Sequence, residues 1–215
     1  MILGIETSSK NCSLALWEGE VLLGSFDRVS EDFLHAEILH EEMNRLLMNA
    51  GVSFSALKGV AVGSGPGSYT GLRIGVSAAK GLALALQIPL YAISGLKMML
   101  SQSAIESEKE VLVVMDARRN EVFGAWRRKS GLLDDPAAII VDDDFIATHA
   151  HHTLVVLGEN ASKLRALLPQ ETTLIDALPS VKSICMKGLD LGEPVDLAYF
   201  EPVYVKPFVP TVSKK

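Results

Sequence analysis

The sequence is poor in cysteine and has no long hydrophobic run. Its two cysteines, Cys12 and Cys185, are far apart and belong to no C-x-x-C pair, which argues against a disulfide framework or a cysteine-based zinc site. The longest uncharged stretch, residues 81–96, contains Gln87 and Pro89 and is too short to cross a bilayer of about 30 Å. Because the chain opens on a strand pattern without a basic leader, we expect no signal peptide, no membrane span and a cytoplasmic location.

Basic residues are also in deficit. The chain carries 20 Lys and Arg against 26 Asp and Glu, a formal net charge of −6. Basic side chains supply most nonspecific affinity for nucleic acid, so this balance opposes unaided binding to RNA. If RNA is involved, another subunit supplies the basic surface. The hydrophobic content, 48% of 215 residues, is enough for a sizeable core in one long domain or two small lobes.

A glycine-rich segment, Gly63–Gly75, is the most informative feature present. It joins the apolar run Val60–Val62 to a long helical pattern, so it predicts a strand, a tight turn around Pro66 and a helix start. The free N–H groups of that helix would point into the turn. Such a turn binds an anion, a carboxylate or a partner's backbone, or serves packing alone, and the sequence leaves these alternatives open.

Two nucleotide-binding motifs are absent from this segment. A Walker A loop closes on a Lys-Ser/Thr pair, but Gly67 is followed by Ser-Tyr-Thr and no lysine occurs before Lys80. The dinucleotide fingerprint has a different glycine spacing and needs an acidic residue about twenty positions later. The sequence lacks both features.

Periodicity predicts the first half of the fold. Strands are expected at 2–6, 12–17, 21–26 and 90–93, and helices at 30–50, with Ser30 as N-cap, and at 70–87. On the first helix, Leu39, Met43 and Leu46 would remain for a second surface, unless the helix has one broad core face. On the second, small residues recur every four positions and would pack closely on the sheet or on a partner helix: Gly71, Gly75, Ala79 and Ala83.

The second half repeats the opening of the chain. An apolar strand with an acidic end, a polar hairpin and a return strand ending in tryptophan occur twice, so that Glu6 corresponds to Asp116 and Trp17 to Trp126. Two such units predict a bilobed α/β architecture with a cleft between lobes at 1–105 and 106–215. In the second lobe we expect a strand at 153–157, helices at 161–168 and 180–187, and irregular chain at 129–150.

Four segments together resemble the TsaB (YeaZ) family: residues 2–8, 63–75, 116–122 and 201–205. The resemblance covers nearly the whole chain. It implies the duplicated fold of the actin, sugar kinase and Hsp70 (ASKHA) superfamily with a reduced second lobe. It also implies a bacterial subunit of the machinery that forms threonylcarbamoyladenosine (t6A) at adenosine 37 of tRNAs reading ANN codons.

The resemblance also implies roles for individual residues. In catalytic relatives the turn after the first strand and the glycine turn approach nucleotide phosphates, which correspond here to Thr7, Ser8, Gly65, Pro66, Gly67 and Ser68. The catalytic paralogue TsaD holds a metal with a His-x-x-x-His pair, but Gly95 and Met99 occupy those places, and neither binds a hard cation well. We therefore expect no metal, no catalytic residue and no resident cofactor, with ATP or ADP bound only at a junction with TsaD.

A noncatalytic scaffold is the function that the resemblance favours. Members pair with TsaD through the two N-terminal helices, form a homodimer through the same face when TsaD is absent, work with the ATPase TsaE, and meet tRNA only through the complex. The residues expected at this partner surface are His35, Leu39, Met43, Leu46, Gly71, Arg73, Gly75, Ala79, Lys80 and Ala83. On this hypothesis Gly75→Leu abolishes partner binding and spares the fold.

The rival hypothesis is an enzyme, either an ATP-using phosphotransferase of the same superfamily or a hydrolase, with Glu6 or Asp116 directing a metal or water. No serine or cysteine stands in a recognisable nucleophile setting, which weakens the hydrolase version. The histidines at 35 and 40 point about 140° apart on a helix and do not form a ligand pair. The run 148–152, which holds three histidines, is expected to be a solvated loop rather than a zinc or nickel site.

Overall fold

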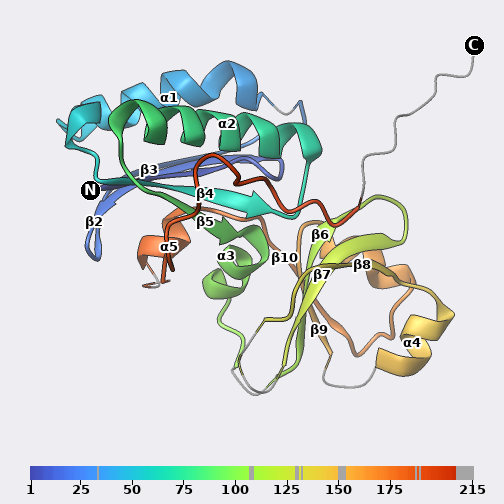
Figure 1. The fold of residues 1–215 in the computed structure, drawn as a ribbon. Helices are drawn as coiled ribbons and strands as arrows, with labels where there is room; N and C mark the ends of the chain where they lie inside the picture. Colours follow the sequence, from blue (N-terminus) through green and yellow to red (C-terminus); the bar gives the residue numbers. More distant parts are fainter. Residues whose placement is uncertain are drawn as a thin grey trace, which may run out of the picture.

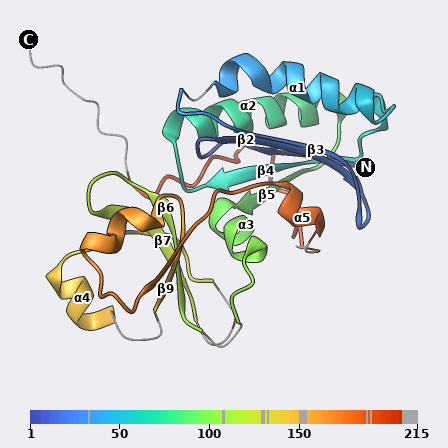
Figure 2. The same cartoon turned by 180° about the vertical axis from the view of Figure 1, so that it is seen from behind.

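The computed structural model describes residues 1–32, 34–106, 109–128, 131, 133–149, 154–186, 188 and 190–206. Two sheets of five strands form two lobes (Figures 1 and 2). The first sheet comprises β1 (Ile2–Glu6), β2 (Asn11–Glu18), β3 (Val21–Val29), β4 (Gly59–Gly65) and β5 (Leu90–Ser94). The second comprises β6 (Val111–Asp116), β7 (Glu121–Arg127), β8 (Ala137–Ile140), β9 (Val155–Gly158) and β10 (Thr173–Asp176).

Five α-helices and two 3-10 turns accompany the described strands. Their bounds are α1 (His35–Asn49), η1 (Phe54–Ala56), α2 (Tyr69–Leu86), α3 (Gly95–Gln102), α4 (Asp143–His149), η2 (Ala161–Ala166) and α5 (Lys182–Met186). Figure 1 shows α1 and α2 over one face of the first sheet and α3 and α5 under the other.

The first sheet has the order β3-β2-β1-β4-β5, and the three strands expected at 2–6, 12–17 and 21–26 form an antiparallel meander within it. β1 pairs with β2 in antiparallel register and with β4 in parallel register, and β4 pairs parallel with β5. Side chains alternate between the faces, as the pleat requires. Leu14 and Leu16 face the core beneath α1 and α2, whereas Ala15 and Trp17 face Val181, which precedes α5.

α1 begins five residues later than predicted. The Ser30 hydroxyl accepts the amide of Asp32 at 3.3 Å and so closes a local turn, and Leu34 occupies the N-cap position. The expected apolar position 33 lies outside the described residues. The helix therefore starts at His35, after a short turn that leads away from β3.

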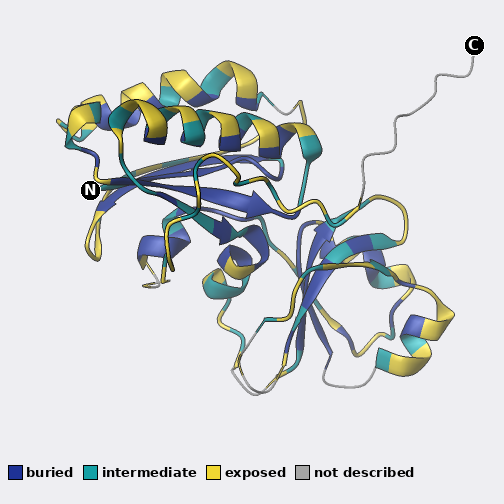
Figure 3. Ribbon diagram, viewed as in Figure 1, coloured by how far each residue is buried: buried dark blue, intermediate teal, exposed yellow. Residues whose placement is uncertain are grey.

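The apolar residues of α1 form one core face. Leu39, Met43 and Leu46 are 0%, 4% and 7% exposed, so the prediction that they remain for a second surface is wrong for Leu39 and Leu46, while Met43 reaches the groove described below with only a small exposed part. α1 lies flat on β2 and β3, and Gly24 of β3 lets the Leu46 side chain approach the sheet closely. Figure 3 shows the buried side of both long helices turned toward the strands and the exposed side turned outward.

The small residues of α2 face the sheet rather than a partner. A Cβ atom on Gly71 would overlap the carbonyl oxygen of Thr7, and one on Gly75 would overlap the Thr7 hydroxyl. Ala79 and Ala83 continue this stripe into the core, 0% and 1% exposed. The four residues are thus inaccessible to a partner, and the expectation that Gly75→Leu would spare the fold is wrong because a leucine has no room there.

The second sheet has the order β10-β9-β6-β7-β8 and repeats the arrangement of the first around β6. The interval 129–150, expected to be irregular, contains β8 and α4, and β10 was not predicted. The helix expected at 161–168 is the shorter 3-10 turn η2. These elements pack Phe145, Leu164 and Leu168 onto the outer face of β6 and β9. Residues 129, 130, 132, 150, 153 and 187 of the predicted segments lie outside the described chain.

α3 joins the two lobes and was also not predicted as a helix. Met98 packs into the first lobe with Ala61 and Ile93, while Leu96 and Met99 pack against β6 and β9 of the second. Gly95 begins this helix and Met99 is fully buried, which is where the structure places the two positions compared with the histidines of TsaD.

After β10 the chain returns to the first lobe. α5 packs under β2 and β3, although its residues fall in the range expected to form the second lobe. The segment 195–206, here called the C-terminal strap, then runs along the edge of the first sheet. The Val195 amide donates to the Leu90 carbonyl at 2.8 Å, and the Val203 amide donates to the Ser64 carbonyl at 2.8 Å.

One carboxyl group is enclosed within the first lobe. Glu6, at the end of β1, is fully buried and one of its oxygens accepts the amide of Ser8. Gly63 of β4 leaves the space that the other oxygen fills. Burial raises the pKa of Glu6 to about 7, against 4.5 for an ordinary glutamate, although hydrogen bonds from Ser8 and Thr7 oppose the shift.

Gly75→Ala and Gly81→Ala form a matched pair of tests on α2. The first forces a methyl group against Thr7 and should destabilise the protein by about 1–3 kcal/mol. The second adds a methyl group where no atom lies within 4 Å, and should stabilise it by up to about 1 kcal/mol through helix propensity. Urea unfolding measures both. Equal effects of the two substitutions would contradict the packing described for this helix.

Glu6→Gln tests the buried carboxyl group through the pH dependence of stability. The folded state binds the Glu6 proton more tightly than the unfolded chain, so the stability from protonated Glu6 is present at low pH and is lost as pH rises from 4.5 to about 7. Between pH 5 and pH 8 the natural chain should lose about 2–3 kcal/mol more unfolding free energy than the variant. Glu193→Gln, at an exposed site, should leave the pH curve unchanged. Parallel curves for the natural chain and Glu6→Gln would refute the assignment.

Candidate functional site

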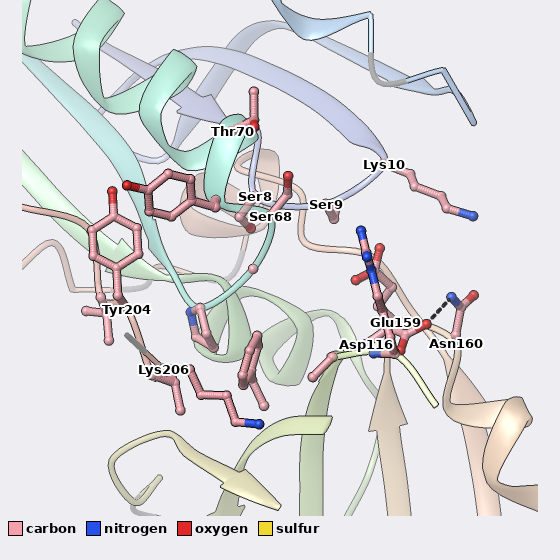
Figure 4. Close-up of a pocket in the computed structure, with 18 residues that line it drawn as sticks. Ser8, Ser9, Lys10, Ser68, Thr70, Asp116, Glu159, Asn160, Tyr204 and Lys206 are labelled. Atoms are coloured by element: carbon pink, nitrogen blue, oxygen red, sulfur yellow. Dashed lines mark hydrogen bonds between the residues drawn. The ribbon is translucent and has the colours of Figure 1, made fainter. Parts of the chain in front are cut away.

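A polar cleft of about 570 Å³ lies between the two lobes. Its walls come from the turn after β1, the glycine turn before α2, the ends of β6 and β9, and the C-terminal strap. Figure 4 shows Ser8, Ser68 and Thr70 on the first-lobe side, facing Asp116, Glu159 and Asn160 of the second lobe. Tyr204 and Lys206 of the strap line a third side.

The first-lobe wall is built from two turns in direct contact. The Ser68 amide donates to the Ser8 carbonyl at 2.7 Å, and the Ser68 hydroxyl caps α2 by accepting the Gly71 amide at 3.2 Å. Gly67 permits this approach, because a Cβ there would overlap the Ser8 backbone. Ser8 is 1% exposed beside the cleft, and its hydroxyl, which lies near the Glu6 carboxyl group and helps to lower that group's pKa, has no well-formed hydrogen bond to another described residue. With the start of α2 it forms a donor set that suits an anionic group.

Four of the six residues predicted to approach nucleotide phosphates line this wall: Ser8, Pro66, Gly67 and Ser68. The other two lie behind it. Thr7 is buried, with its hydroxyl donating to the Gly71 carbonyl at 2.7 Å. Gly65 has a positive φ of 100° and lies next to the Val203 carbonyl and the Leu72 side chain. Both shape the wall without facing the cleft.

The second-lobe wall centres on Asp116. Its side chain accepts hydrogen bonds from Lys163, from the Asn160 amide group at 2.9 Å and from the Arg118 backbone amide at 2.7 Å. Partial burial alone would raise the pKa of Asp116, but these bonds, Lys163 foremost, hold it below its ordinary value. Asp116 is therefore ionised at neutral pH, with both oxygens already engaged.

Glu159 is a second carboxyl group of the cleft and is nearly buried. Burial raises its pKa above the ordinary value, although hydrogen bonds from the backbone amides of Asp116 and Lys10 partly oppose this. Because Lys10 belongs to the first lobe and Asp116 to the second, Glu159 lies where the two lobes face each other across the cleft.

Three lysines around the cleft form ion pairs with carboxylates of the same chain. Lys10 contacts Glu31 at 2.5 Å, Lys163 contacts Asp116, and Lys206 of the strap pairs with Glu121 on β7. Sequence analysis identified Asp116 but missed Glu159, Asn160 and Lys163. The available signal was their position after the predicted strand at 153–157, because neighbouring parallel strands bring their carboxyl ends to the same edge.

A second cavity, of about 1100 Å³, is an apolar groove between the outer faces of α1 and α2. Of the ten residues predicted at the partner surface, only Met43 and Arg73 line it. The other lining residues are Phe54 of η1 and positions of α1 and α2 that lie beside the predicted ones: Ala36, His40, Asn44, Tyr69, Thr70, Ile74, Ser77, Ala78, Gly81, Leu82 and Ala85. The sequence signal for it was the row Ile74, Ala78 and Leu82, adjacent to the buried stripe.

Three predicted partner residues with polar side chains have internal partners. His35 is buried, with Nε2 at 2.7 Å from the Ser9 carbonyl, and burial lowers its pKa. The Lys80 ammonium donates to the Phe200 carbonyl of the strap at 2.9 Å. The Arg73 guanidinium lies 4.2 Å from the centre of the Tyr69 ring, and its Nε donates to the Tyr204 hydroxyl at 3.4 Å. Arg73 alone of these is exposed.

The histidine run at 148–152 is only partly described. His149 ends α4 and stacks on Trp126 and Phe145, while residues 150–152 lie outside the described chain. Within the part of the chain that the structure describes, no three His, Cys, Asp or Glu side chains meet in a metal-binding group. In the same part, no helix is long and apolar enough to cross a membrane.

Comparison with known proteins gives a family match. The family model for TsaD, tRNA N6-adenosine threonylcarbamoyltransferase, matches residues 32–181 of the chain. The tRNA threonylcarbamoyladenosine biosynthesis protein TsaB of Escherichia coli (strain K12) is 35% identical over 126 residues, 58% of this chain and 53% of that protein. The protein of the same name from Bacillus subtilis (strain 168) is 33% identical over 134 residues, covering 62% of this chain and 58% of that protein. The match thus spans little more than half the length of these curated relatives.

Solved structures extend the likeness to almost the whole chain. YeaZ from Pseudomonas aeruginosa superposes with a TM-score of 0.77 at 29% identity, covering 94% of this chain and 98% of that one. A protein described as similar to peptidase YEAZ, from Pseudomonas aeruginosa, superposes with a TM-score of 0.79 at 28% identity, covering 95% and 99%. The predicted two-lobe, ASKHA-like α/β fold is confirmed. The chain therefore belongs to the family that the TsaD model describes, as one of its TsaB (YeaZ) members.

Proposed function

We propose that this chain is a noncatalytic subunit of the machinery that forms t6A in tRNA, and that it acts by pairing with a TsaD-type protein. The observation that carries the proposal is the apolar groove between α1 and α2. The names of the relatives, which are tRNA threonylcarbamoyladenosine biosynthesis proteins, support the pathway.

The groove has the character of a protein-binding surface. Its lining combines aliphatic, aromatic and small residues with polar ones at its margins, and an exposed leucine and methionine outside the lining lie on the same two helices, Leu84 at 69% and Met48 at 70%. Exposed apolar side chains on a hollowed surface are typical of interaction sites. A stable helix-pair interface buries on the order of 1,600 Å² in total, which the outer faces of two helices of 15 and 18 residues can supply.

A TsaD-type chain is the occupant that fits this surface. The present chain matches the TsaD family model, so a TsaD-type partner carries an equivalent pair of helices over an equivalent sheet. Two such pairs can meet face to face about a two-fold axis, and a second copy of this chain can do the same when the partner is absent. TsaE and tRNA would then join through the complex, in the cytoplasm.

The carboxylates that an enzyme of this fold would use support a noncatalytic role. Glu6 is enclosed in the first lobe and does not line the cleft, and both oxygens of Asp116 are held by residues of the second lobe. The rival phosphotransferase or hydrolase would need one of these groups to face its substrate. The donors at Ser8 and the start of α2 suit a phosphate of ATP or ADP held at the junction with the partner, with no metal or cofactor resident in the chain alone.

Ala85→Glu tests the groove as the partner surface. A carboxylate placed among apolar contacts loses its water on binding, so we expect at least a tenfold weaker complex with the TsaD-type protein, measured by titration calorimetry. Ala147→Glu, on the exposed side of α4 in the second lobe, is the matched control and should bind as the natural chain does. Binding unaffected by Ala85→Glu would place the interface elsewhere.

A reconstitution tests the function itself. The purified chain is combined with the TsaD-type and TsaE proteins of its own organism, with ATP, tRNA and an activated donor, threonylcarbamoyl adenylate labelled in its threonine, whose adenylate leaves as AMP on transfer. We expect label to enter tRNA only when the chain is present together with its partners, and none with the chain alone. Modification of equal rate without the chain, or by the chain by itself, would overturn the proposal.

A further inference from the structure

The groove and the cleft meet at one point, the N-terminal turn of α2. Tyr69 and Thr70 line both cavities. On the groove side, the Arg73 guanidinium covers the Tyr69 ring at 4.2 Å. On the cleft side, the Tyr204 ring of the strap packs against Tyr69 with ring centres 5.0 Å apart. A single aromatic side chain is thus shared between the two surfaces.

The strap forms one wall of the cleft with its last described residues. Val203, Tyr204, Val205 and Lys206 all line it. The strap is attached on both sides, to the first lobe through the Val203 amide and the Ser64 carbonyl, and to the second through Lys206 and Glu121. Between these attachments Tyr204 is 37% exposed, and its side chain contacts Tyr69 and Arg73 of α2.

We propose that Arg73, Tyr69 and Tyr204 form a latch through which occupancy of the groove controls the strap wall of the cleft. Arg73 contacts Tyr204 directly through the hydrogen bond to its hydroxyl at 3.4 Å, and indirectly through its cation–π contact with the Tyr69 ring, which packs against Tyr204. A partner surface in the groove that offers a carboxylate or a ring to the exposed Arg73 draws the guanidinium away. Tyr204 then loses its hydrogen bond, and the strap separates more readily from the first lobe.

The latch is a property of the chain alone, while its use by a partner rests on the proposed function. The two can therefore fail separately. If the latch is absent, the strap will not respond to Arg73 even though the partner binds. If the partner does not bind the groove, the strap will still respond in the isolated chain.

Amide hydrogen exchange on the full, isolated chain tests the latch. The reporter is the Val203 amide, which is protected by Ser64 and must open when the strap lifts. Arg73→Ala should speed its exchange by about two- to fivefold, the factor that corresponds to about 0.5–1 kcal/mol for an exposed cation–π contact. Tyr204→Phe, which keeps the ring and removes the hydroxyl, should give a smaller increase.

Two matched substitutions serve as controls. Arg45→Ala removes an exposed arginine of α1 that pairs with Glu41 and Glu42 of the same helix, and Tyr199→Ala removes a strap tyrosine that is 85% exposed. Both should leave Val203 exchange unchanged. The Leu16 amide, in the middle of the first sheet, reports global opening and should not change in any variant. Unchanged Val203 exchange in Arg73→Ala, equal acceleration by a control, or parallel acceleration at Leu16 would each overturn the latch.

Discussion

The start of α2 rests directly on the backbone and hydroxyl of Thr7, and the arrangement of both cavities depends on this approach. Gly71 and Gly75 allow it because a methyl group at either position would overlap Thr7. With the helix this close, Ser68 reaches the Ser8 carbonyl and the two turns form one wall of the cleft. The same placement leaves Ile74, Ala78 and Leu82, which are partly buried against the first-lobe core, on the flank of α2 where they line the groove with α1. One steric constraint thus positions the polar and the apolar cavity together.

The two copies of the repeated unit place equivalent carboxyl groups in different electrostatic environments. Glu6 and Asp116 hold equivalent places at the ends of β1 and β6. Glu6 is fully enclosed and its pKa is raised to about 7, whereas Asp116 is stabilised as an anion by Lys163 and Asn160. The repeat therefore preserves the backbone and the position of a carboxyl group without preserving its charge. Similarity of sequence pattern alone did not reveal this difference, because the neighbours that decide it come from other elements.

The sequence was sufficient for the elements whose periodicity is strong. The strands of the first meander, the helix from the glycine turn and the internal repeat are all present in the structure. It failed where short segments carry weak patterns, as with β8, α4 and β10, whose four to seven residues gain their order from packing on β6, β7 and β9. The start of α1 was misplaced because Ser30 could cap a helix but caps a turn instead.

For the candidate partner surface, the sequence predicted the correct two helices but the wrong faces of those helices. The buried stripe Gly71 to Ala83 and the outer row Ile74 to Leu82 differ by one position, and only the contact with Thr7 decides which faces the sheet. Likewise, Leu39 and Met43 belong to an apolar arc wide enough for two surfaces, yet the flat seating of α1 on β2 and β3 buries them. Residues such as Glu159 and Lys163 acquire their roles through strand neighbours far away in the chain.

α3 sets the aperture of the cleft. Met98 is embedded in the first lobe and Leu96 and Met99 in the second, so rotating the lobes apart would strip apolar side chains from both cores. Burial of each such side chain contributes roughly 1.5–3 kcal/mol, so a hinge motion of the lobes at this helix is energetically unfavourable. A ligand in the cleft therefore binds between two walls that are already held at a fixed separation. A ligand would therefore enter and leave past residues 203–206 of the C-terminal strap, which line the cleft and belong to neither sheet.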